Sequence, residues 1–329
     1  MKRVVITGPT GAIGRALINE ALNKGYEVLA VVHRDSTRAD ELGGIPRCQV
    51  LKLDLSEYPK AIEEMEKQGI RWEMTEKDPE SIFFHLAWEA SFGEGRNDVH
   101  VQMQNVRASM EAVSFAVALG CGTFVGAGSQ AEYGRVEQQP GSMFPDLSLR
   151  PETPTNPDTG YGSAKLCAGH FTRYFAEHEG LRHIWIRVLS VYGPYDRPET
   201  MISTAVSRML QNEETEFTPS EQIWDYIYSE DAARAFLLAG EKGVSGRTYV
   251  LGSGEGHPLR WYIERIAAIT GYKKEIGFGK RPYNENQVMH LVADITKLMD
   301  DTGFEPAIGF DMGIQALVER YRIQNLTEL

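Results

Sequence analysis

Short apolar runs alternate along this chain with longer segments in which apolar residues recur every three or four positions. The runs have the length of buried parallel strands, and the longer segments have the period of amphipathic helices. Such an alternation predicts an α/β fold, with a doubly wound parallel sheet that helices cover on both faces. The expected strands are residues 4–6, 27–33, 49–53, 81–87, 123–127 and 183–189.

The alternation changes after Pro194. Residues 196–223 have no clear period, whereas residues 231–239 have a helical one. A short apolar run at 248–251 could rejoin the sheet as a further strand. We therefore expect a dinucleotide-binding Rossmann domain of residues 1–195 plus 225–252, and a smaller mixed α/β substrate-binding cap of residues 196–224 plus 253–329.

Three glycines at a spacing of three lie between the first strand and the first helix. Gly8 permits a tight turn, Gly11 lets a diphosphate approach the main chain, and Gly14 lets the helix pack closely on the strand. The turn could also be a well-packed βα turn without a ligand, but a strand before it, a helix after it and a second strand beyond favour dinucleotide binding. The expected contacts in this turn are Gly8, Thr10, Gly11, Ala12, Ile13 and Gly14.

Charged residues follow the second expected strand, where the adenine ribose of a dinucleotide would lie. His33 and Arg34 occupy the first positions, and Asp35 comes next. An acidic side chain accepts hydrogen bonds from both ribose hydroxyls of NAD, whereas an arginine suits the 2′-phosphate of NADP. Arg34, supported by Ser36 and Arg38, therefore favours NADP as the cofactor. Asp35 leaves NAD as the alternative cofactor. All of these residues could also be solvated loop charges that contact no cofactor.

The overall charge of the chain restricts its partners. A net charge of −12 argues against a nucleic acid or a membrane surface as the main partner, because either would repel the protein. The three cysteines have no paired metal-ligand spacing, so we expect reduced thiols and no metal site. The first strand begins without a signal peptide, and no apolar run approaches the ~18 residues of a membrane span. A cytoplasmic protein is expected.

A tyrosine and a lysine stand four positions apart on the helix that follows the fifth expected strand. This offset places Tyr161 and Lys165 on one helix face, where the ammonium can stabilise the phenolate and lower the pKa of the phenol for acid–base catalysis. They could instead be an exposed tyrosine and a solvated lysine. Ser129 follows the fifth strand, where its hydroxyl could hold the substrate oxygen, or it could be an ordinary turn serine.

These residues together resemble the extended short-chain dehydrogenase/reductase family, particularly its nucleotide-sugar epimerases, dehydratases and 4-ketoreductases. The resemblance runs through nearly the whole chain and its landmarks occur in the family's order. They are TGPTGAIG at residues 7–14, LDL around Asp54, HLA at 85–87, the helix with Asn105, Ser129 four residues before Tyr133, YGSAK from Tyr161 and RVLSVYGP at 187–194.

The resemblance implies that Ser129, Tyr161 and Lys165 are the catalytic triad, and that Asn105 is a structural residue that kinks its helix. It also implies a homodimer through the helices at 99–119 and 161–179, although these could face only their own sheet. The cofactor contacts expected outside the glycine turn are His33, Arg34, Asp54, Leu55, Leu86, Ala87 and Lys165.

Departures from the family pattern narrow the reaction. The family's 4,6-dehydratases carry acidic residues after the catalytic serine or threonine, where this chain has Gln130 and Ala131. Glu132 stands one place late and should point elsewhere, so dehydration is disfavoured. Arg34, through NADP, favours a reductase over an epimerase that retains NAD. We expect reduction of a 4-keto carbon in a nucleotide-linked 6-deoxyhexose with Tyr161 as proton donor; an epimerase, or a dinucleotide-binding sensor without turnover, is the alternative.

Signals for the substrate site are fewer. Trp224 replaces an arginine that contacts the sugar nucleotide in many relatives, which leaves Arg281 as the phosphate partner that the resemblance suggests. Trp88 follows HLA where a small residue is usual, so it either narrows the substrate pocket or packs. A proline-rich loop at 140–157 could form one wall. The expected substrate contacts are Trp88, Gln130 and Arg281.

Overall fold

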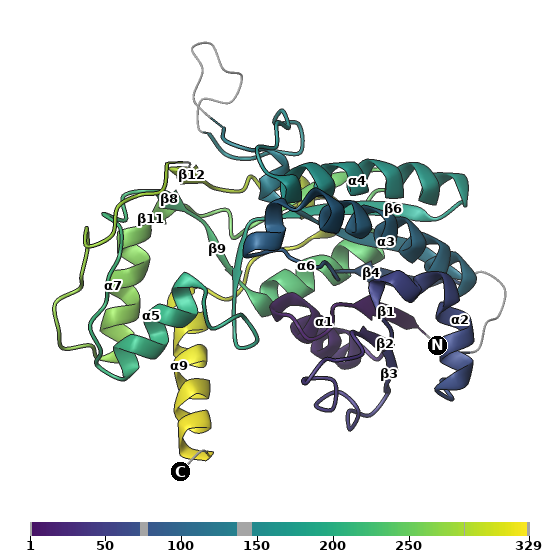
Figure 1. The fold of residues 1–329 in the computed structure, drawn as a ribbon, viewed down its shortest axis with the longest axis horizontal. Helices are drawn as coiled ribbons and strands as arrows, with labels where there is room; N and C mark the ends of the chain where they lie inside the picture. The colour runs from purple at the N-terminus through teal and green to yellow at the C-terminus, as the bar shows by residue number, and fades with distance from the viewer. Residues whose placement is uncertain (1, 73–77, 137–146, 286, 328–329) are drawn as a thin grey trace.

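In the computed structural model, which describes residues 2–72, 78–136, 147–285 and 287–327, parallel strands form a seven-stranded sheet (Figure 1). The strand order is β10-β6-β5-β4-β1-β2-β3. From β1 the chain adds strands toward one edge, β2 and then β3, and from β4 it adds them toward the other edge, so the strand order switches between β1 and β4. A crevice opens at such a switch, outside the carboxyl ends of the strands. The strands are β1 (Arg3–Thr7), β2 (Glu27–Val32), β3 (Cys48–Lys52), β4 (Asp78–His85), β5 (Cys121–Ser129), β6 (Arg182–Val188) and β10 (Thr248–Leu251).

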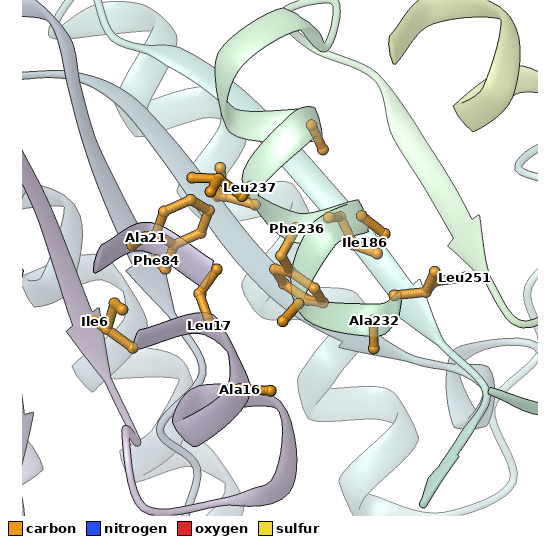
Figure 2. Close-up of a cluster of buried hydrophobic side chains, with 14 of the residues drawn as sticks. Ile6, Ala16, Leu17, Ala21, Phe84, Ile186, Ala232, Phe236, Leu237 and Leu251 are labelled. Atoms are coloured by element: carbon orange, nitrogen blue, oxygen red, sulfur yellow. The ribbon is translucent and has the colours of Figure 1, made fainter. Parts of the chain in front are cut away.

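Helices cover both faces of this sheet, which confirms the predicted doubly wound fold (Figure 1). α1 (Ala12–Asn23) and α6 (Ser229–Lys242) lie on one face, and α3 (Val99–Ala118) and α4 (Gly160–His178) on the other. Figure 2 shows apolar side chains of α1 and α6 meeting those of the strands. Because both faces are buried, the inner strands β1 and β2 are mostly apolar, whereas the edge strand β3 has both buried and exposed residues.

Most predicted elements are present, with shifted bounds. The predicted strand at 248–251 joins the sheet beside β6, as the sequence allowed. β4 begins earlier than predicted, because the polar residues at its start still pair with β5. The predicted helix at 57–68 is divided into a 3-10 helix, η1 (Leu55–Lys60), and a short α2 (Ala61–Lys67). Pro59, which cannot donate a backbone hydrogen bond, lies inside η1.

A second apolar cluster forms from helices of the later chain, α5 (Met201–Leu210), α7 (Leu259–Thr270) and α9 (Phe310–Thr327). We propose that this cluster is the cap of the predicted domain division. Three short strands order as β11-β8-β12, and β7 pairs with β9. These elements are β7 (Ser190–Tyr192), β8 (Ile223–Trp224), β9 (Tyr226–Tyr228), β11 (His257–Pro258) and β12 (His290–Leu291), with α8 (Thr296–Thr302) following.

A buried carboxylate ties the cap strands to the end of the sheet. Asp225, between β8 and β9, has no exposed surface. It accepts hydrogen bonds from the backbone amides of Ser253, Gly254 and Ala293.

None of the described helices is both long and apolar enough to cross a membrane.

Candidate active site

The glycine turn between β1 and α1 is shaped by close backbone contacts. Gly8 has φ +67°, and a Cβ atom there would lie 2.9 Å from the Ala87 amide nitrogen. A Cβ atom on Gly14 would lie 2.3 Å from the Gly8 carbonyl oxygen. Gly11, in contrast, is exposed and a Cβ atom would meet only an ordinary contact at 3.7 Å. The protein itself therefore requires Gly8 and Gly14, whereas Gly11 leaves the start of α1 open to a ligand.

A cavity of about 800 Å³ opens beside this turn and runs along the ends of β2, β3 and β4 to α3. Its volume and its lining of glycine turn, apolar strand ends and a few polar groups suit the adenosine part of a dinucleotide. The residues present thus fit the expected cofactor. Of the predicted contacts, the cavity wall includes Gly8, Thr10, His33, Asp54, Leu55 and Ala87.

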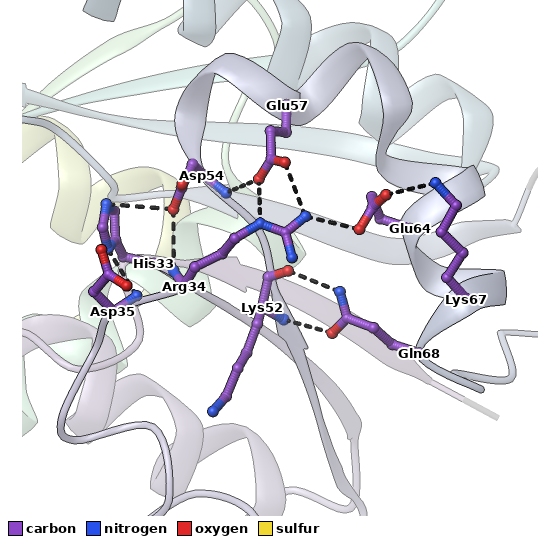
Figure 3. Close-up of polar contacts among 9 residues, drawn as sticks. All are labelled: His33, Arg34, Asp35, Lys52, Asp54, Glu57, Glu64, Lys67 and Gln68. Atoms are coloured by element: carbon purple, nitrogen blue, oxygen red, sulfur yellow. Dashed lines mark hydrogen bonds and ion pairs between the residues drawn. The ribbon is translucent and has the colours of Figure 1, made fainter.

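The Arg34 guanidinium, which favoured NADP in the sequence, is held by two carboxylates (Figure 3). Its Nε and Nη2 lie 2.7 and 2.8 Å from the carboxylate oxygens of Glu57, and Nη2 lies 2.7 Å from Glu64. These contacts raise the pKa of Arg34 and lower the pKa of Glu64 to about 2. A 2′-phosphate would have to compete with both carboxylates for this arginine.

Asp54 organises the same strand end from the other side. Its Oδ1 accepts a hydrogen bond from the Arg34 amide at 3.0 Å and lies 3.3 Å from Nε2 of His33 (Figure 3). The Asp54 carboxylate also caps η1 in a capping box with Glu57. His33 and Asp54 therefore lie together at the cavity wall, and their contacts with a cofactor stay a prediction.

The predicted catalytic residues Ser129, Tyr161 and Lys165 converge at the carboxyl end of β5. Ser129 is the last residue of β5, and α4 begins beside it with Thr159 as its N-cap. Tyr161 lies in the first turn of α4, and its side chain reaches that of Ser129. Lys165 lies one helical turn on, and its ammonium donates to the Ala127 carbonyl oxygen at 2.7 Å. The three side chains thus share one end of one strand.

The charge state of this group differs from the sequence-based expectation that Lys165 lowers the pKa of Tyr161. Burial raises the pKa of Tyr161, and the hydrogen bond with Ser129 and the charge of Arg96 offset this rise only in part. Burial also lowers the pKa of Lys165 itself to about 7. The expectation was wrong because it counted the lysine charge and not the loss of water around both groups. The phenol is consequently protonated at neutral pH.

A loop after β4 covers Tyr161 with two side chains. The guanidinium carbon of Arg96, in the 3-10 helix η2 (Glu94–Asn97), lies 4.3 Å from the centroid of the Tyr161 ring. Trp88 meets the same ring edge-on at 5.9 Å, and the Lys165 ammonium lies 3.7 Å from the Trp88 ring centroid. The sequence predicted Trp88 near the substrate but missed Arg96, since no motif or helical period marks this loop.

Polar residues beneath the loop hold it in place. The Asn105 side chain accepts from the Glu89 amide and donates to the Glu89 carbonyl, both at 2.9 Å. Asn105 therefore anchors the loop, and α3 runs from Val99 to Ala118 through it; the kink that the resemblance implied stays a prediction. His85 is buried, and its ring nitrogens contact the Thr7 and Ser109 hydroxyls, so it packs in the core.

Glu132 is directed into the protein interior rather than toward a substrate, in agreement with the expectation that it points elsewhere. The side chain has no exposed surface, and its Oε2 accepts from Nε of Arg187 at 2.6 Å. Its Oε1 accepts from the Trp185 indole at 3.0 Å and from the Ser129 amide at 2.9 Å. Because all its contacts are internal, Glu132 cannot act as an acid on a substrate from this position.

The other predicted substrate contacts, Gln130 and Arg281, lie in different parts of the fold. Gln130 is half-buried on the 3-10 helix η3 (Gln130–Glu132), directly after Ser129. Arg281 lies on the cap, where its Nε is 3.4 Å from the Glu216 carboxylate. Trp224, which stands where many relatives have an arginine, donates to the Ser190 hydroxyl at 2.8 Å. Residues 140–146 of the predicted loop wall lie outside the described residues.

The sheet order, the glycine turn and the cavity define a dinucleotide-binding protein of the extended short-chain dehydrogenase/reductase class. The chain belongs to the NAD dependent epimerase/dehydratase family, whose model matches residues 4–252. No metal-binding group of histidine, cysteine or acidic residues occurs in the described part of the chain.

Individual relatives carry several names. A dTDP-glucose 4,6-dehydratase of Xanthomonas campestris is 27% identical over 180 residues, 51% of this chain, and the chain spans only about half, 51%, of that relative's length. A dTDP-4-dehydro-6-deoxyglucose reductase of Escherichia coli is 24% identical over 326 residues, 97% of each chain.

Solved structures show the same fold. A UDP-glucose 4-epimerase of Thermotoga maritima superimposes with a TM-score of 0.78 at 24% identity, over 98% of this chain and 99% of that one. RMD from Pseudomonas aeruginosa, complexed with NADPH, gives 0.76 at 21% identity, over 98% of this chain and 100% of that one. At these identities the likeness concerns the fold alone.

Proposed function

We propose that this protein reduces the 4-keto carbon of a nucleotide-linked 4-keto-6-deoxyhexose, with Ser129, Tyr161 and Lys165 as its catalytic residues. The observation that carries the proposal is the meeting of Ser129 and Tyr161 at the end of β5 while Glu132 is turned away. A proton donor for a ketone is then in place without an acid for expelling water. The E. coli reductase, which matches over nearly its whole length, supports this reading over dehydration.

In the proposed reaction, bound NAD(P)H supplies a hydride to the carbonyl carbon. The Ser129 hydroxyl orients the carbonyl oxygen by a hydrogen bond. Tyr161, kept protonated by its raised pKa, donates its phenolic proton to the oxygen as negative charge develops there. The charge of Arg96, which lies 4.3 Å from the centroid of the phenol ring, stabilises the phenolate that remains.

For the reductant we propose NADPH, because a net reduction consumes cofactor and the loops beside the glycine turn are rich in arginine. NADH is the alternative, and the pairing of Arg34 with Glu57 and Glu64 favours it. The same pairing favours the second candidate function, a nucleotide-sugar 4-epimerase that retains NAD. Purified protein that carries tightly bound NAD and interconverts nucleotide sugars without net oxidation of cofactor would establish the epimerase.

The proposed function is tested by following NADPH and NADH absorbance with dTDP-4-dehydro-6-deoxyglucose, the ketosugar in the name of the E. coli relative. We expect stoichiometric oxidation of the cofactor by wild-type protein. Tyr161→Phe should lose at least about a hundredfold in kcat while it still binds cofactor, since it lacks only the donated proton. Full activity of Tyr161→Phe would refute the assigned mechanism, and absence of turnover with every nucleotide ketosugar would favour a non-catalytic sensor.

A further inference from the structure

Three arginines from separate parts of the chain meet at Tyr195, in the segment that follows β7. Arg15 comes from the first turn of α1, and its guanidinium carbon lies 5.3 Å from the Tyr195 ring centroid. Arg320 comes from α9, lies 4.3 Å from the same centroid and donates to the Tyr195 hydroxyl at 3.3 Å. Arg38, in the loop after β2, donates to the Tyr195 carbonyl at 3.4 Å.

No carboxylate in the described part of the chain forms an ion pair with any of these three arginines. In a protein with a net charge of −12, unpaired arginines gathered at one point are unexpected. The electrostatic effect is evident on the tyrosine. Burial would raise the pKa of Tyr195, but hydrogen bonds from Arg15 and Arg320, together with their charges, lower it.

Part of this positive charge is also buried without a partner. The Nε and Nη1 atoms of Arg15 and the Nε atom of Arg320 are shielded from solvent and make no hydrogen bond. A buried donor that lacks an acceptor costs free energy, so native proteins rarely keep one without a reason. Three such nitrogens, on two arginines that both contact Tyr195, lack an acceptor of the kind that an anion would supply.

We propose that Arg15, Arg38 and Arg320 bind a phosphate group of a ligand that occupies the cleft. The inference rests on the proposed function for the identity of that ligand. Arginine forks match phosphate oxygens in geometry and charge. Arg15 directly follows Gly14 in the helix whose start faces the cavity, and Arg38 belongs to the loop that begins with His33 at the cavity wall.

Two ligands could bring this phosphate: NADPH through its 2′-phosphate, or the nucleotide sugar through its diphosphate. Arg34 is already held by Glu57 and Glu64, whereas the Tyr195 cluster has unused donors. Arg320 comes from the C-terminal helix, so a phosphate bound here would join that helix to α1. The charge of the ligand would offset the repulsion among the three guanidinium groups.

The test measures equilibrium binding of NADPH, NADH and dTDP by titration calorimetry, which does not depend on turnover. The variants are Arg320→Met and Arg38→Met; Arg322→Met, an exposed arginine on the same helix, removes equal charge and is the control. Arg38 is exposed, so its variant should fold even if Arg320→Met does not. We expect both test variants to weaken one phosphate ligand by about tenfold, and the control to leave it unchanged.

Weaker NADPH binding with unchanged NADH binding identifies the 2′-phosphate, and weaker dTDP binding identifies the substrate diphosphate. Either result supports the phosphate site even if no ketosugar is reduced. The proposed phosphate site is therefore tested independently of the proposed function. If neither variant weakens any of the three ligands beyond the effect of Arg322→Met, the arginines only pack on Tyr195 and the proposal is wrong.

Discussion

At the scale of single residues, Arg96 offers the most direct control over the chemistry proposed for Tyr161. Its guanidinium lies on one face of the phenol ring and favours the phenolate, and the Ser129 hydrogen bond acts in the same direction. Burial and the Glu132 carboxylate oppose them, and the Lys165 ammonium lies 5.8 Å from the ring centroid. Removing the Arg96 charge should therefore raise the pKa of Tyr161.

We predict that Arg96→Met slows alcohol oxidation, the reverse reaction, at pH 8. Oxidation needs the phenolate as base, so its rate should fall about tenfold for each unit by which the pKa rises. Ketone reduction at pH 7 should change far less, because the phenol is protonated in both proteins. Arg96→Lys, which keeps the charge, should restore the wild-type pH profile. Equal losses in both directions would instead indicate a merely structural role for Arg96.

The carboxylates around Arg34 lead to a prediction about cofactor choice. Glu57→Gln combined with Glu64→Gln should release the Arg34 guanidinium for a 2′-phosphate and tighten NADPH binding relative to NADH. Glu63→Gln, an exposed position on the same helix that pairs with Lys67, is the matched control. Fluorescence titration of both cofactors measures the ratio. A ratio that equals that of the control would show that Arg34 does not contact the cofactor phosphate.

The sequence predicted Ser129, Tyr161 and Lys165 because their positions relative to β5 and α4 are local features. It could not predict the partners of Arg34, since Glu57 and Glu64 are 23 and 30 residues away and lie on η1 and α2, whose shape depends on Pro59. It also missed Arg96 for a physical reason. The Asn105 side chain holds the loop that carries Arg96, and no periodic sequence pattern marks either the loop or this contact.

At the scale of elements, the buried pair between η3 and β6 fixes the end of β5. Arg187 and Glu132 are both nearly inaccessible to water. We predict that Glu132→Gln lowers the free energy of unfolding by about 3–5 kcal/mol, because it leaves the Arg187 charge buried without a counter-charge. Urea denaturation measures this loss.

The control for that prediction is Glu177→Gln on α4, which breaks an exposed pair with Arg173 at 3.7 Å. Exposed pairs contribute little, so this variant should lie within about 0.5 kcal/mol of wild type. Similar stabilities of the two variants would mean that the Arg187 charge finds another partner or water. Apolar periodicity in the sequence predicted the strands and helices themselves. It could not predict the pair of Glu132 and Arg187, which are 55 residues apart in the chain.

At the scale of the whole molecule, the outer surface of α3 and α4 carries unusually exposed apolar side chains. Val99 and Met103 on α3 are 64% and 54% exposed, and Phe171 and Tyr174 on α4 are 51% and 74% exposed. The two helices lie beside each other on one face of the sheet (Figure 1). Apolar side chains gathered on one face are typical of an interaction surface, and we propose that a second copy of the chain covers them.

We predict a homodimer by analytical ultracentrifugation and its dissociation by Phe171→Asp, because a carboxylate would have to be buried in the interface. Val244→Asp changes an exposed apolar residue outside these helices and should leave the dimer intact. A wild-type monomer, or a dimer that Phe171→Asp does not weaken, would show that α3 and α4 face only their own sheet.

The central claim is that Tyr161 and its neighbours direct a hydride from a nicotinamide cofactor to a sugar carbonyl. The most direct measurement uses NADPH or NADH deuterated at C4 of the nicotinamide together with a nucleotide-linked 4-keto-6-deoxyhexose, followed by mass spectrometry and NMR of the sugar product. The account predicts one deuterium at C4 of the sugar for each cofactor oxidised, and the same product formed at least about a hundredfold more slowly with Tyr161→Phe. Cofactor that stays reduced with the ketosugar, or a product without deuterium at C4, would contradict it.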